Sequence, residues 1–357
     1  MRVYFDYSVF TLQKYGGASK YILNLVDNFS NNVDPLIISP FYKNIELKNS
    51  KKAKRFFYYN KLGFLHKASN GFNKFYLNYL IKKNNPDVLH YTYFNEKNLY
   101  KSKSKTIVTE YDLIKEIFYK DIYSDQIEFK KKLFDKTDHI ICISNNTKED
   151  ILRYYNLKNK NISVIHLAVD KKKSFNHKKI NIKPFILFVG SRSRYKNFYN
   201  TIKAFAQSTA LKRDFDFVCF GGGKFNRSEI KLFNELKINE NNIHFFYGDE
   251  KDLNFFYKNA RIFVFPSLYE GFGLPLLEAM NMECPVICSN TSSFPEVVND
   301  AAIQFDPKNI DEIQSIIEET IYKDDVLKKL INKGNINLSK YSWKNCANET
   351  EEIYKKL

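Results

Sequence analysis

The most informative stretch of the sequence runs from Phe263 to Ser289 and reads FVFPSLYEGFGLPLLEAMNMECPVICS. An apolar run of strand-forming residues ends at Pro266, and a loop with two glycines follows it. Pro275 suits the first turn of a helix, where its missing N–H is no loss. The predicted elements are a strand at 263–265, a helix from 275 and a strand at 285–288. This order is typical of an α/β fold.

Two carboxylates accompany this loop, since Glu270 lies within it and Glu278 lies in the first turns of the helix. Glycines let a backbone approach a ligand closely, and the N–H groups at a helix start favour a bound anion. Carboxylates suit such a place where they face neutral hydroxyls, and a sugar joined to a nucleoside diphosphate offers both phosphates and hydroxyls. The alternative is a plain strand–helix unit, in which Glu270 is solvated and Glu278 offsets the helix dipole.

The segment from Glu270 to Glu278, in the setting PSLYEGFGLPLLEAM, resembles the Glu-x7-Glu motif of the retaining glycosyltransferases of family 4. Flanking residues match the same family, and these are Pro285-Val286, Ser292 to Val297, Asp300 to Ala302 and Phe305 to Pro307. The resemblance implies the GT-B fold, an α/β architecture in which two Rossmann-like domains face each other across a cleft.

The length of 357 residues leaves room for two domains. We predict an N-terminal, acceptor-side Rossmann-like domain at residues 1–170 and a C-terminal, nucleotide-sugar-binding Rossmann-like domain at residues 171–340. Residues 169–184, which include three consecutive lysines and show no apolar periodicity, are the expected linker. The resemblance implies that the C-terminal helix, within residues 341–357, packs back on the N-terminal domain.

Cations follow the apolar strand predicted at residues 185–189. Arg192 and Lys196 lie at its carboxyl end, where open α/β sheets bind ligands and where cations suit a diphosphate. Both match the Gly-x-Arg…Lys-Asn pattern of the family, which implies that they hold the donor phosphates and stabilise the leaving group. Arg194 falls between them and receives no role. The alternative is a set of surface cations at a helix start.

Two places in the first domain resemble ligand contacts of the family. Gly16 and Gly17 match a Gly-Gly loop that faces the donor's diphosphate and sugar, although a simple loop is the plainer interpretation of the spacing. His90 ends one predicted strand and Asp112 follows another, and both are expected on the acceptor or sugar side, with a structural role as the alternative for His90. Tyr111 stands where the family's Thr-x-His-Asp pattern has its histidine, which weakens this assignment.

The resemblance also assigns roles around the motif. The predicted catalytic set is Glu270, Arg192 and Lys196, with Glu270 holding a hydroxyl of the transferred sugar. The predicted donor-binding set is Gly16, Gly17, Tyr247, Gly271, Phe272, Gly273, Leu274 and Glu278. Within it, Glu278 would hold the ribose, and the loop at Tyr247 would lie against the base. We expect no metal site and no cofactor besides the nucleotide sugar, because cations and amides take a metal's place, and we expect retention through same-face attack.

The combined patterns QKYGG, GSRxxYKNF and SLYEGFGLP resemble bacterial mannosyltransferases that build O-antigen or capsule. They imply a hexosyltransferase with a nucleotide sugar as donor, GDP-mannose first and a UDP-hexose second. The implied acceptor is a glycan or a lipid-diphosphate-linked glycan. A catalytically silent sugar-nucleotide-binding subunit is the alternative, and Tyr111 is the one feature that favours it.

Positive charge is concentrated in the first half of the chain. The formal net charge is +16, and residues 51–85 contain nine lysines and arginines, several aromatic residues and no acid. Such a stretch could grip the phosphates of an anionic membrane surface or of a nucleic acid, or it could be a solvated basic helix pair. We retain the membrane surface as a candidate partner and expect no nucleic acid.

The five cysteines are scattered and odd in number, and their spacing completes no zinc site. We interpret all five as small core residues in a reduced compartment. No stretch resembles a signal peptide, and no run approaches the roughly 18 apolar residues of a membrane span. These observations predict a cytoplasmic protein that can also lie peripherally on the inner face of the membrane.

Overall fold

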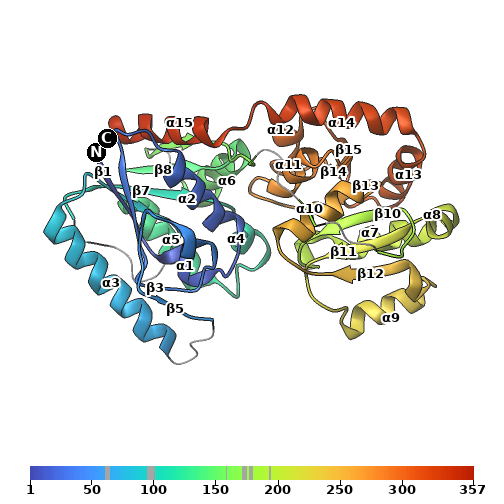
Figure 1. The fold of residues 1–357 in the computed structure, drawn as a ribbon, viewed down its shortest axis with the longest axis horizontal. Helices are drawn as coiled ribbons and strands as arrows, with labels where there is room; N and C mark the ends of the chain where they lie inside the picture. Colours follow the sequence, from blue (N-terminus) through green and yellow to red (C-terminus); the bar gives the residue numbers. More distant parts are fainter. Residues whose placement is uncertain are drawn as a thin grey trace. The chain divides into compact units, whose positions relative to one another are not determined.

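The computed structural model describes residues 1–60, 65–94, 100, 102–157, 159–170, 175–176, 180–192 and 194–357, with side chains from residue 68 onward in the helix that begins at 65. Parts of the basic stretch and of the expected linker lie outside these residues. The chain forms two compact units, drawn in Figure 1. Unit 1 comprises Met1–Leu167 and Ser342–Leu357, and unit 2 comprises Ala168–Tyr341. The predicted boundaries, 170/171 and 340/341, lie within three residues of those of the two units.

Unit 1 contains a parallel sheet of seven strands in the order β4-β2-β1-β6-β7-β8-β9. The strands are β1 (Arg2–Phe5), β2 (Asp34–Ile38), β4 (Ala53–Lys54), β6 (Val88–Tyr91), β7 (Lys105–Glu110), β8 (His139–Cys142) and β9 (Asn161–Val164). A separate pair joins β3 (Phe41–Tyr42) to β5 (Phe57–Tyr58). The chain leaves β1 toward β2 and later returns to β6 on the other side, so a topological switch point lies between β1 and β6.

The helices of unit 1 are α1 (Ser8–Leu12), α2 (Gly17–Asn28), α3 (Leu65–Asn84), α4 (Ile114–Phe118), α5 (Ser124–Lys136), α6 (Asn145–Tyr155) and α15 (Trp343–Lys355), with a 3-10 turn η1 (Glu46–Asn49). The C-terminal helix α15 packs on α2, with the rings of Trp343 and Tyr21 6.3 Å apart. Glu351 on α15 also accepts hydrogen bonds from the amide and hydroxyl of Ser30. The C-terminal helix therefore belongs to unit 1.

Helix α6 is capped by Ser144 rather than by Thr147. Ser144 is the N-cap residue, and its hydroxyl accepts the Thr147 amide at 3.0 Å. Both residues can cap a helix. Ser144 is the cap because its backbone, just after β8, is extended, as an N-cap residue requires.

Unit 2 contains a parallel sheet of six strands in the order β12-β11-β10-β13-β14-β15. The strands are β10 (Phe185–Val189), β11 (Asp216–Phe220), β12 (Ile243–Phe246), β13 (Ile262–Phe265), β14 (Val286–Ser289) and β15 (Ile303–Phe305). The switch point lies between β10 and β13. Every residue of β10, β11, β13 and β14 is buried, which accounts for their apolar runs, with polar residues only at Asp216 and Ser289 on the strand ends.

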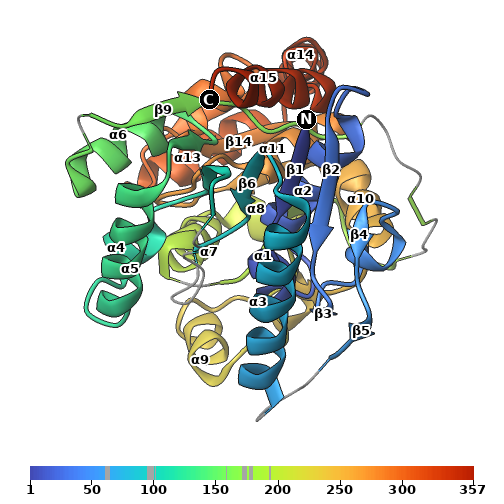
Figure 2. The same ribbon diagram turned by 90° about the vertical axis from the view of Figure 1, so that its left-hand side faces the viewer.

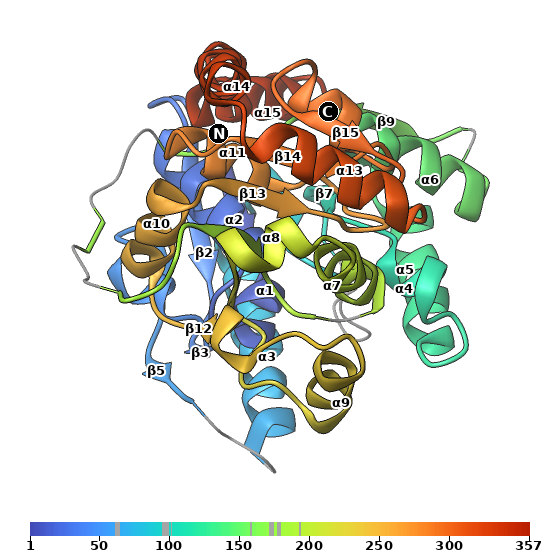
Figure 3. The ribbon, with the colours of Figure 1, turned by 90° about the vertical axis from the view of Figure 1, so that its right-hand side faces the viewer.

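The helices of unit 2 are α7 (Phe198–Gln207), α8 (Thr209–Asp214), α9 (Arg227–Glu235), α10 (Glu250–Asn259), α11 (Leu274–Asn281), α12 (Phe294–Val298), α13 (Ile310–Ile321) and α14 (Asp324–Leu338), with 3-10 turns η2 (Arg194–Lys196) and η3 (Glu240–Asn242). Figure 3 shows α7 and α13 side by side on unit 2. The core beneath α7 is aromatic, since Phe198 packs its ring edge against Phe188 and Phe217.

Helix α14 continues through a glycine to its end at Leu338. Gly334 lies inside it, and a Cβ there would come within 3.2 Å of Met280 Cγ on α11. A glycine near a helix end usually signals termination, but here it permits the close packing of α14 on α11.

All five cysteines are buried without disulfide partners, as predicted. None of the described helices has both the length and the apolar composition needed to cross a membrane.

Candidate active site

Lys196 and Glu270 meet at the carboxyl ends of two neighbouring strands of unit 2. Lys196 lies in η2, beyond the end of β10, and Glu270 lies in the loop beyond β13. The Lys196 Nζ to Glu270 Oε1 distance is 2.5 Å, and the side chains are only 13% and 14% exposed. The ammonium also lies 5.0 Å from the ring centre of Phe265. Two of the three predicted catalytic residues therefore form one ion pair at the switch point of the sheet.

Backbone contacts hold these two segments together. The Leu268 amide donates to the carbonyl of Tyr195 at 2.7 Å, which links the Glu270 loop directly to η2. Asn197, in the left-handed conformation with φ +58°, donates from its side chain to the carbonyl of Pro307 at 2.7 Å. Lys196 thus lies between two anchored neighbours, which limits the motion of its backbone.

The start of α11 faces the same region. Gly273 is the N-cap with φ +100°, and a Cβ there would lie 3.0 Å from Leu276 Cδ1 and 3.2 Å from Phe294 Cε1. The predicted donor contacts Gly271, Phe272 and Leu274 surround this cap, and Pro275 occupies the first turn. Pro275 has no N–H and the Leu276 amide donates to the Gly273 carbonyl at 2.9 Å, so this helix start offers an anion the Leu274 amide and a favourable dipole.

Glu278 lies further along α11 and is half-buried. The Tyr257 hydroxyl, which is buried, donates to Glu278 Oε2 at a long 3.5 Å. Burial and, next, the negative charge of Glu278 raise the pKa of Tyr257 well above its ordinary value, so the hydroxyl stays protonated. The structure therefore gives the two glutamates different neighbours: a cation for Glu270 and a neutral hydroxyl for Glu278.

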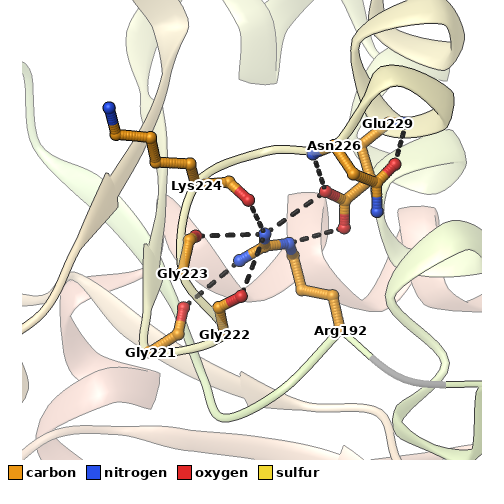
Figure 4. A network of polar contacts seen from close by, with 7 residues as sticks. All are labelled: Arg192, Gly221, Gly222, Gly223, Lys224, Asn226 and Glu229. Carbon is orange, nitrogen blue, oxygen red and sulfur yellow. Dashed lines mark hydrogen bonds and ion pairs between the residues drawn. The ribbon is translucent and has the colours of Figure 1, made fainter.

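Arg192 lies in a different environment from the one predicted (Figure 4). Its side chain is only 4% exposed. It forms a bidentate ion pair with Glu229, in which the Nε–Oε1 distance is 2.6 Å and the Nη2–Oε2 distance is 3.2 Å. The remaining donors point at backbone carbonyls, namely those of Gly221, Gly222, Gly223 and Lys224, at 2.9 to 3.5 Å. In this arrangement, Arg192 holds the glycine loop that follows β11.

The glycine loop is shaped for this guanidinium. Gly221, Gly222 and Gly223 have φ of +90°, +72° and +76°, a conformation that other residues adopt at a cost. A Cβ on Gly222 would lie 2.7 Å from Arg192 Nη1. A phosphate contact by Arg192 therefore requires the guanidinium to exchange some of its carbonyl partners for phosphate oxygens.

Tyr247, the predicted contact to the base, directly follows β12 and is 77% exposed. An aromatic ring this exposed, at the carboxyl end of a strand, can stack on a planar ligand. The loop ends at Asp249, which caps α10 and shares a capping box with Asp252. The ring is therefore attached to a firmly capped helix start.

In unit 1, Gly16 and Gly17 lie at the start of α2, with Gly17 as its first residue. The Gly16 carbonyl accepts the Lys20 amide at 3.1 Å and the Ser19 hydroxyl at 2.9 Å. A Cβ on Gly16 would lie 1.9 Å from Gln13 Oε1. The Gln13 side chain therefore already occupies the space beside Gly16. A contact between Gly16 and the donor stays a prediction.

His90 lies in the core of unit 1. Its ring nitrogens pair with the Tyr354 hydroxyl at 2.7 Å and the Thr109 hydroxyl at 2.8 Å, and the side chain has no exposed surface. Burial lowers its pKa to about 3, so the ring is neutral. This placement, against α15, favours the structural alternative that the sequence left open for His90.

Tyr111 and Asp112 follow β7 and also support local structure. The Tyr111 hydroxyl donates to the Thr92 carbonyl at 3.0 Å, and its ring packs edge-on against Tyr21. Asp112 accepts the Ile114 amide at 3.0 Å, which forms a local turn just before α4. The residue in place of the family's histidine thus fills the core.

A buried charge cluster, which the sequence analysis missed, lies beside Asp112. Lys130 Nζ contacts Glu110 Oε1 at 2.5 Å and Glu116 Oε1 at 2.8 Å, and all three side chains are 4% exposed or less. Tyr155 donates to Glu116, and Lys130 also donates to the Asp112 carbonyl at 3.0 Å. Burial raises the pKa of Glu110 to about 8, against the opposing charge of Lys130. Nothing in the spacing of these residues along the sequence marks them as a cluster.

Ser292 and Ser293 were noticed in the sequence only as matching flanks of the motif. In the structure both hydroxyls bond to the backbone of the Glu270 loop.

Comparison with known proteins accounts for both units. Residues 15–173 match the family described as Glycosyltransferase Family 4, and residues 169–336 match the family described as Glycosyl transferases group 1. The two matched segments together span most of the chain.

Named relatives match parts of this chain. O-antigen chain mannosyltransferase B of Escherichia coli is 43% identical over 111 residues, which cover 31% of this chain and 29% of that protein. O-antigen chain mannosyltransferase RfbU of Salmonella typhimurium is 27% identical over 228 residues, which cover 63% of each. The matched segments thus span less than two thirds of the length of either relative.

The fold has a counterpart among solved structures. HepE of Anabaena, in complex with UDP and glucose, aligns with a TM-score of 0.75 at 13% identity, over 100% of this chain and 99% of that one. This similarity shows a shared fold of two parallel-sheet α/β units, the GT-B fold. With both of its units matched, the chain belongs to the family 4 glycosyltransferases.

Proposed function

We propose that this protein is a retaining hexosyltransferase of surface polysaccharide synthesis, with GDP-mannose as the first candidate donor. The observation that carries the proposal is the Lys196–Glu270 pair beside the start of α11, because it combines a cation, amides and a carboxylate at one switch point. The mannosyltransferase names of the two relatives support the choice of mannose. The acceptor would be a hydroxyl of a glycan or of a lipid-diphosphate-linked glycan.

The proposed chemistry is electrostatic. Lys196 and the amides at the start of α11 would stabilise the diphosphate as it leaves, and this needs no obligatory divalent ion. Glu270 would bind a hydroxyl of the transferred sugar, and Glu278 would bind the ribose. The acceptor oxygen would attack from the face that the diphosphate leaves, and the leaving phosphate would take its proton, which retains the anomeric configuration.

Arg192 is proposed as a second cation for the diphosphate. The structure adds a condition to this role, since the guanidinium must give up carbonyl partners in the glycine loop to reach a phosphate. Its pairing with Glu229 can persist during that exchange, because the pair uses only two of its five N–H groups. The glycine loop would then move together with donor binding.

A panel of nucleotide sugars tests the proposal. The purified chain is incubated with GDP-mannose, UDP-glucose, UDP-galactose and UDP-N-acetylglucosamine, and mass spectrometry follows release of the nucleoside diphosphate. GDP-mannose should turn over fastest, and Lys196→Ala should abolish most of that turnover, whereas Lys203→Ala, an exposed lysine on α7, should not. Turnover of a UDP-sugar alone would move the donor to the second candidate. Binding without turnover of any donor would support a silent subunit.

An exposed aromatic surface on unit 1 suggests where a lipid-linked acceptor is met. The aromatic surface consists of Phe56, Phe57, Phe72, Phe75 and Tyr79, each 41% to 68% exposed. Helix α3, which carries three of these residues, lies on the outside of unit 1 beside β3 and β5 (Figure 2). Its rings contact one another, with Phe72 and Phe75 6.5 Å apart. Exposed aromatic clusters of this kind mark interaction sites.

Lysines accompany the aromatic surface on the same segments. Those with described side chains are Lys51, Lys52, Lys54, Lys74, Lys82 and Lys83, and no acid occurs between residues 51 and 85. Aromatic rings prefer the membrane–water interface, and lysines are attracted to anionic headgroups. We therefore propose that the aromatic surface rests on an anionic membrane that carries the acceptor.

A further inference from the structure

Ser292 has a backbone conformation that serine rarely adopts. Its φ is +58°, in the left-handed region, where a Cβ is strained and glycine or asparagine is usual. The residue lies in the short turn between β14 and α12. Strained residues of this kind persist where the surrounding structure fixes them, and they cluster at functional sites.

The strained turn places the Ser292 hydroxyl beside the backbone of Glu270. The hydroxyl accepts the Glu270 amide at 3.1 Å and donates to the Glu270 carbonyl at 2.5 Å. One side chain thus satisfies both backbone groups of the residue whose carboxylate pairs with Lys196. A glycine at this position would adopt the conformation freely, but it would provide no hydroxyl.

Neighbouring hydroxyls complete the attachment. Ser293, which is buried, donates to the carbonyls of Glu270 at 3.0 Å and Phe272 at 2.9 Å. Thr291 donates to the carbonyl of Leu268 at 3.3 Å. Carbonyls of the loop are therefore turned toward the 291–293 turn. Ser292 differs from its neighbours because it alone of the three bonds to both the amide and the carbonyl of Glu270.

We propose that Ser292 is a positioning residue for sugar transfer, which acts by fixing the Glu270 backbone so that the carboxylate reaches the transferred sugar. This rests on the proposed role of Glu270. The strain at Ser292 is retained because the hydroxyl must reach the loop, and the hydroxyl is what the reaction needs. Without it, Glu270 keeps its charge but loses its fixed orientation, and orientation errors lower turnover more than ground-state binding.

Two substitutions separate the hydroxyl from the strain. Ser292→Ala removes the hydroxyl and keeps the strained conformation, whereas Ser292→Gly removes both. The glycine variant should therefore have the higher melting temperature of the two. Both variants should lose kcat equally, by about tenfold or more, while the affinity for the nucleoside diphosphate changes less than about threefold.

Lys237 supplies the matched control. It has φ +53°, is exposed and lies beyond α9, away from the loop. Lys237→Gly should likewise melt above Lys237→Ala, but both should keep the wild-type kcat. This comparison shows how much of any change comes from relief of strain alone.

The kcat values, measured below the melting temperature of the least stable variant, test whether the Ser292 hydroxyl is needed for sugar transfer. A wild-type kcat in Ser292→Gly, with or without a loss in Ser292→Ala, would overturn the proposal, because the hydroxyl would then be dispensable. Glu270→Ala, assayed in parallel, distinguishes a failure of the proposed function from a failure of the proposed role of Ser292. If Glu270→Ala is fully active, the proposed function of the site fails; if it is inactive while Ser292→Gly is active, only the role of Ser292 fails.

Discussion

At the scale of single residues, the two glutamates of the motif differ in their surroundings. Glu270 sits in a loop that is bonded on both sides and faces a lysine, whereas Glu278 sits on a regular helix beside a buried tyrosine. The loop position of Glu270 fits the proposed contact to the transferred sugar, which strengthens in the transition state. The helix position of Glu278 fits the proposed contact to the ribose, which is the same in the ground state and the transition state.

We therefore expect the two alanine variants to fail in different ways. Glu270→Ala should chiefly lower kcat, because its contact orients the sugar as the bond breaks. Glu278→Ala should chiefly raise the donor KM, because ribose contacts are alike in ground and transition states. Calorimetric titration of the nucleoside diphosphate checks this division: near-normal affinity is expected for the first variant and weaker affinity for the second. Equal affinities in both would contradict it.

The two predicted cations should also differ. Lys196→Ala and Arg192→Ala should each lower kcat/KM by roughly 10²-fold or more, through lost stabilisation of the leaving diphosphate. Arg192→Ala should in addition lower the free energy of unfolding by about 3 kcal/mol, because it leaves Glu229 buried without its partner.

Thermal melts and steady-state kinetics on the same samples test this difference. A double variant, Arg192→Ala with Glu229→Gln, should regain part of the stability while the activity stays low. If activity returned together with stability, Arg192 would serve only to hold the glycine loop.

Glu110 in the buried cluster should make stability depend on pH. Burial raises its pKa to about 8 in the folded state, above the ordinary range near 4.5 of an unfolded glutamate. Between these values the unfolded chain releases a proton that the folded chain keeps, so the Glu110 contribution is full below pH 4.5 and is lost as the pH rises through 8. Glu110→Gln removes this loss. Its melting temperature relative to wild type should rise from pH 5 to pH 9, and a difference that is independent of pH would refute the assignment.

At the residue scale, sequence reasoning found the groups that lie in one motif and missed those that the fold assembles. Glu270 and Lys196 were assigned through a family resemblance, and the structure places them in contact. Ser292 and the Lys130 cluster were not identified, because their partners lie 14 to 22 residues away in the sequence. His90 lies in β6, near the carboxyl end where ligands bind, but α15 covers it, which only the tertiary packing reveals.

At the scale of elements, helix α3 is notable because several of its aromatic side chains are exposed and do not pack in the core. It lacks acids, and its exposed rings continue onto β5. Its side chains can bind a membrane in two ways that respond differently to salt. Salt screens the attraction of the lysines to anionic lipids, but it does not weaken the burial of aromatic rings at the interface.

We expect the lysines and the aromatic rings to make separate contributions to vesicle binding. Substituting Lys74, Lys82 and Lys83 by alanine should weaken binding to vesicles rich in phosphatidylglycerol by roughly tenfold or more at low salt, at about 1 kcal/mol for each lysine. Phe72→Ser with Phe75→Ser should weaken the binding that remains at high salt. Tyr154→Ala, an exposed ring on α6, is the control. Flotation assays measure all three, and binding that ignores both lipid charge and ring removal would exclude a membrane role.

Most strands could be predicted within one or two residues, because a buried parallel strand is an uninterrupted apolar run. Helix ends were harder. Helix α1 has only five residues and was not predicted, and α14 continues through Gly334 because α11 packs closely there. A helix end depends on neighbours that the local sequence does not contain.

At the scale of the whole molecule, the two units share a plan: a parallel sheet with a switch point beside its first strand. Alternating strands and helices indicate an α/β fold, and the pairing of two such units followed from resemblance to a family. The boundaries near residues 167 and 341 could be placed only within a few residues, because the segments that join the units lack periodicity.

If cations and amides of one unit suffice for departure of the diphosphate, the intact enzyme should work without divalent ions. Dialysis against EDTA should leave the rate of sugar transfer within about twofold of the untreated rate, since the charge is balanced by fixed protein groups. Transfer is measured with and without added Mg²⁺ or Mn²⁺. A rate that collapses on chelation and returns with metal would show that an ion takes part.

The burial of every cysteine has a practical consequence for watching this enzyme move. All five thiols are at most 2% exposed, and burial raises their pKa, so maleimide dyes should leave them unmodified in the folded protein. Ile122 in unit 1 and Ile336 in unit 2 are 73% and 69% exposed. Cysteines introduced at these two sites would accept a fluorophore pair in the otherwise native sequence, and energy transfer between the dyes would test whether donor binding changes the distance between the two sites.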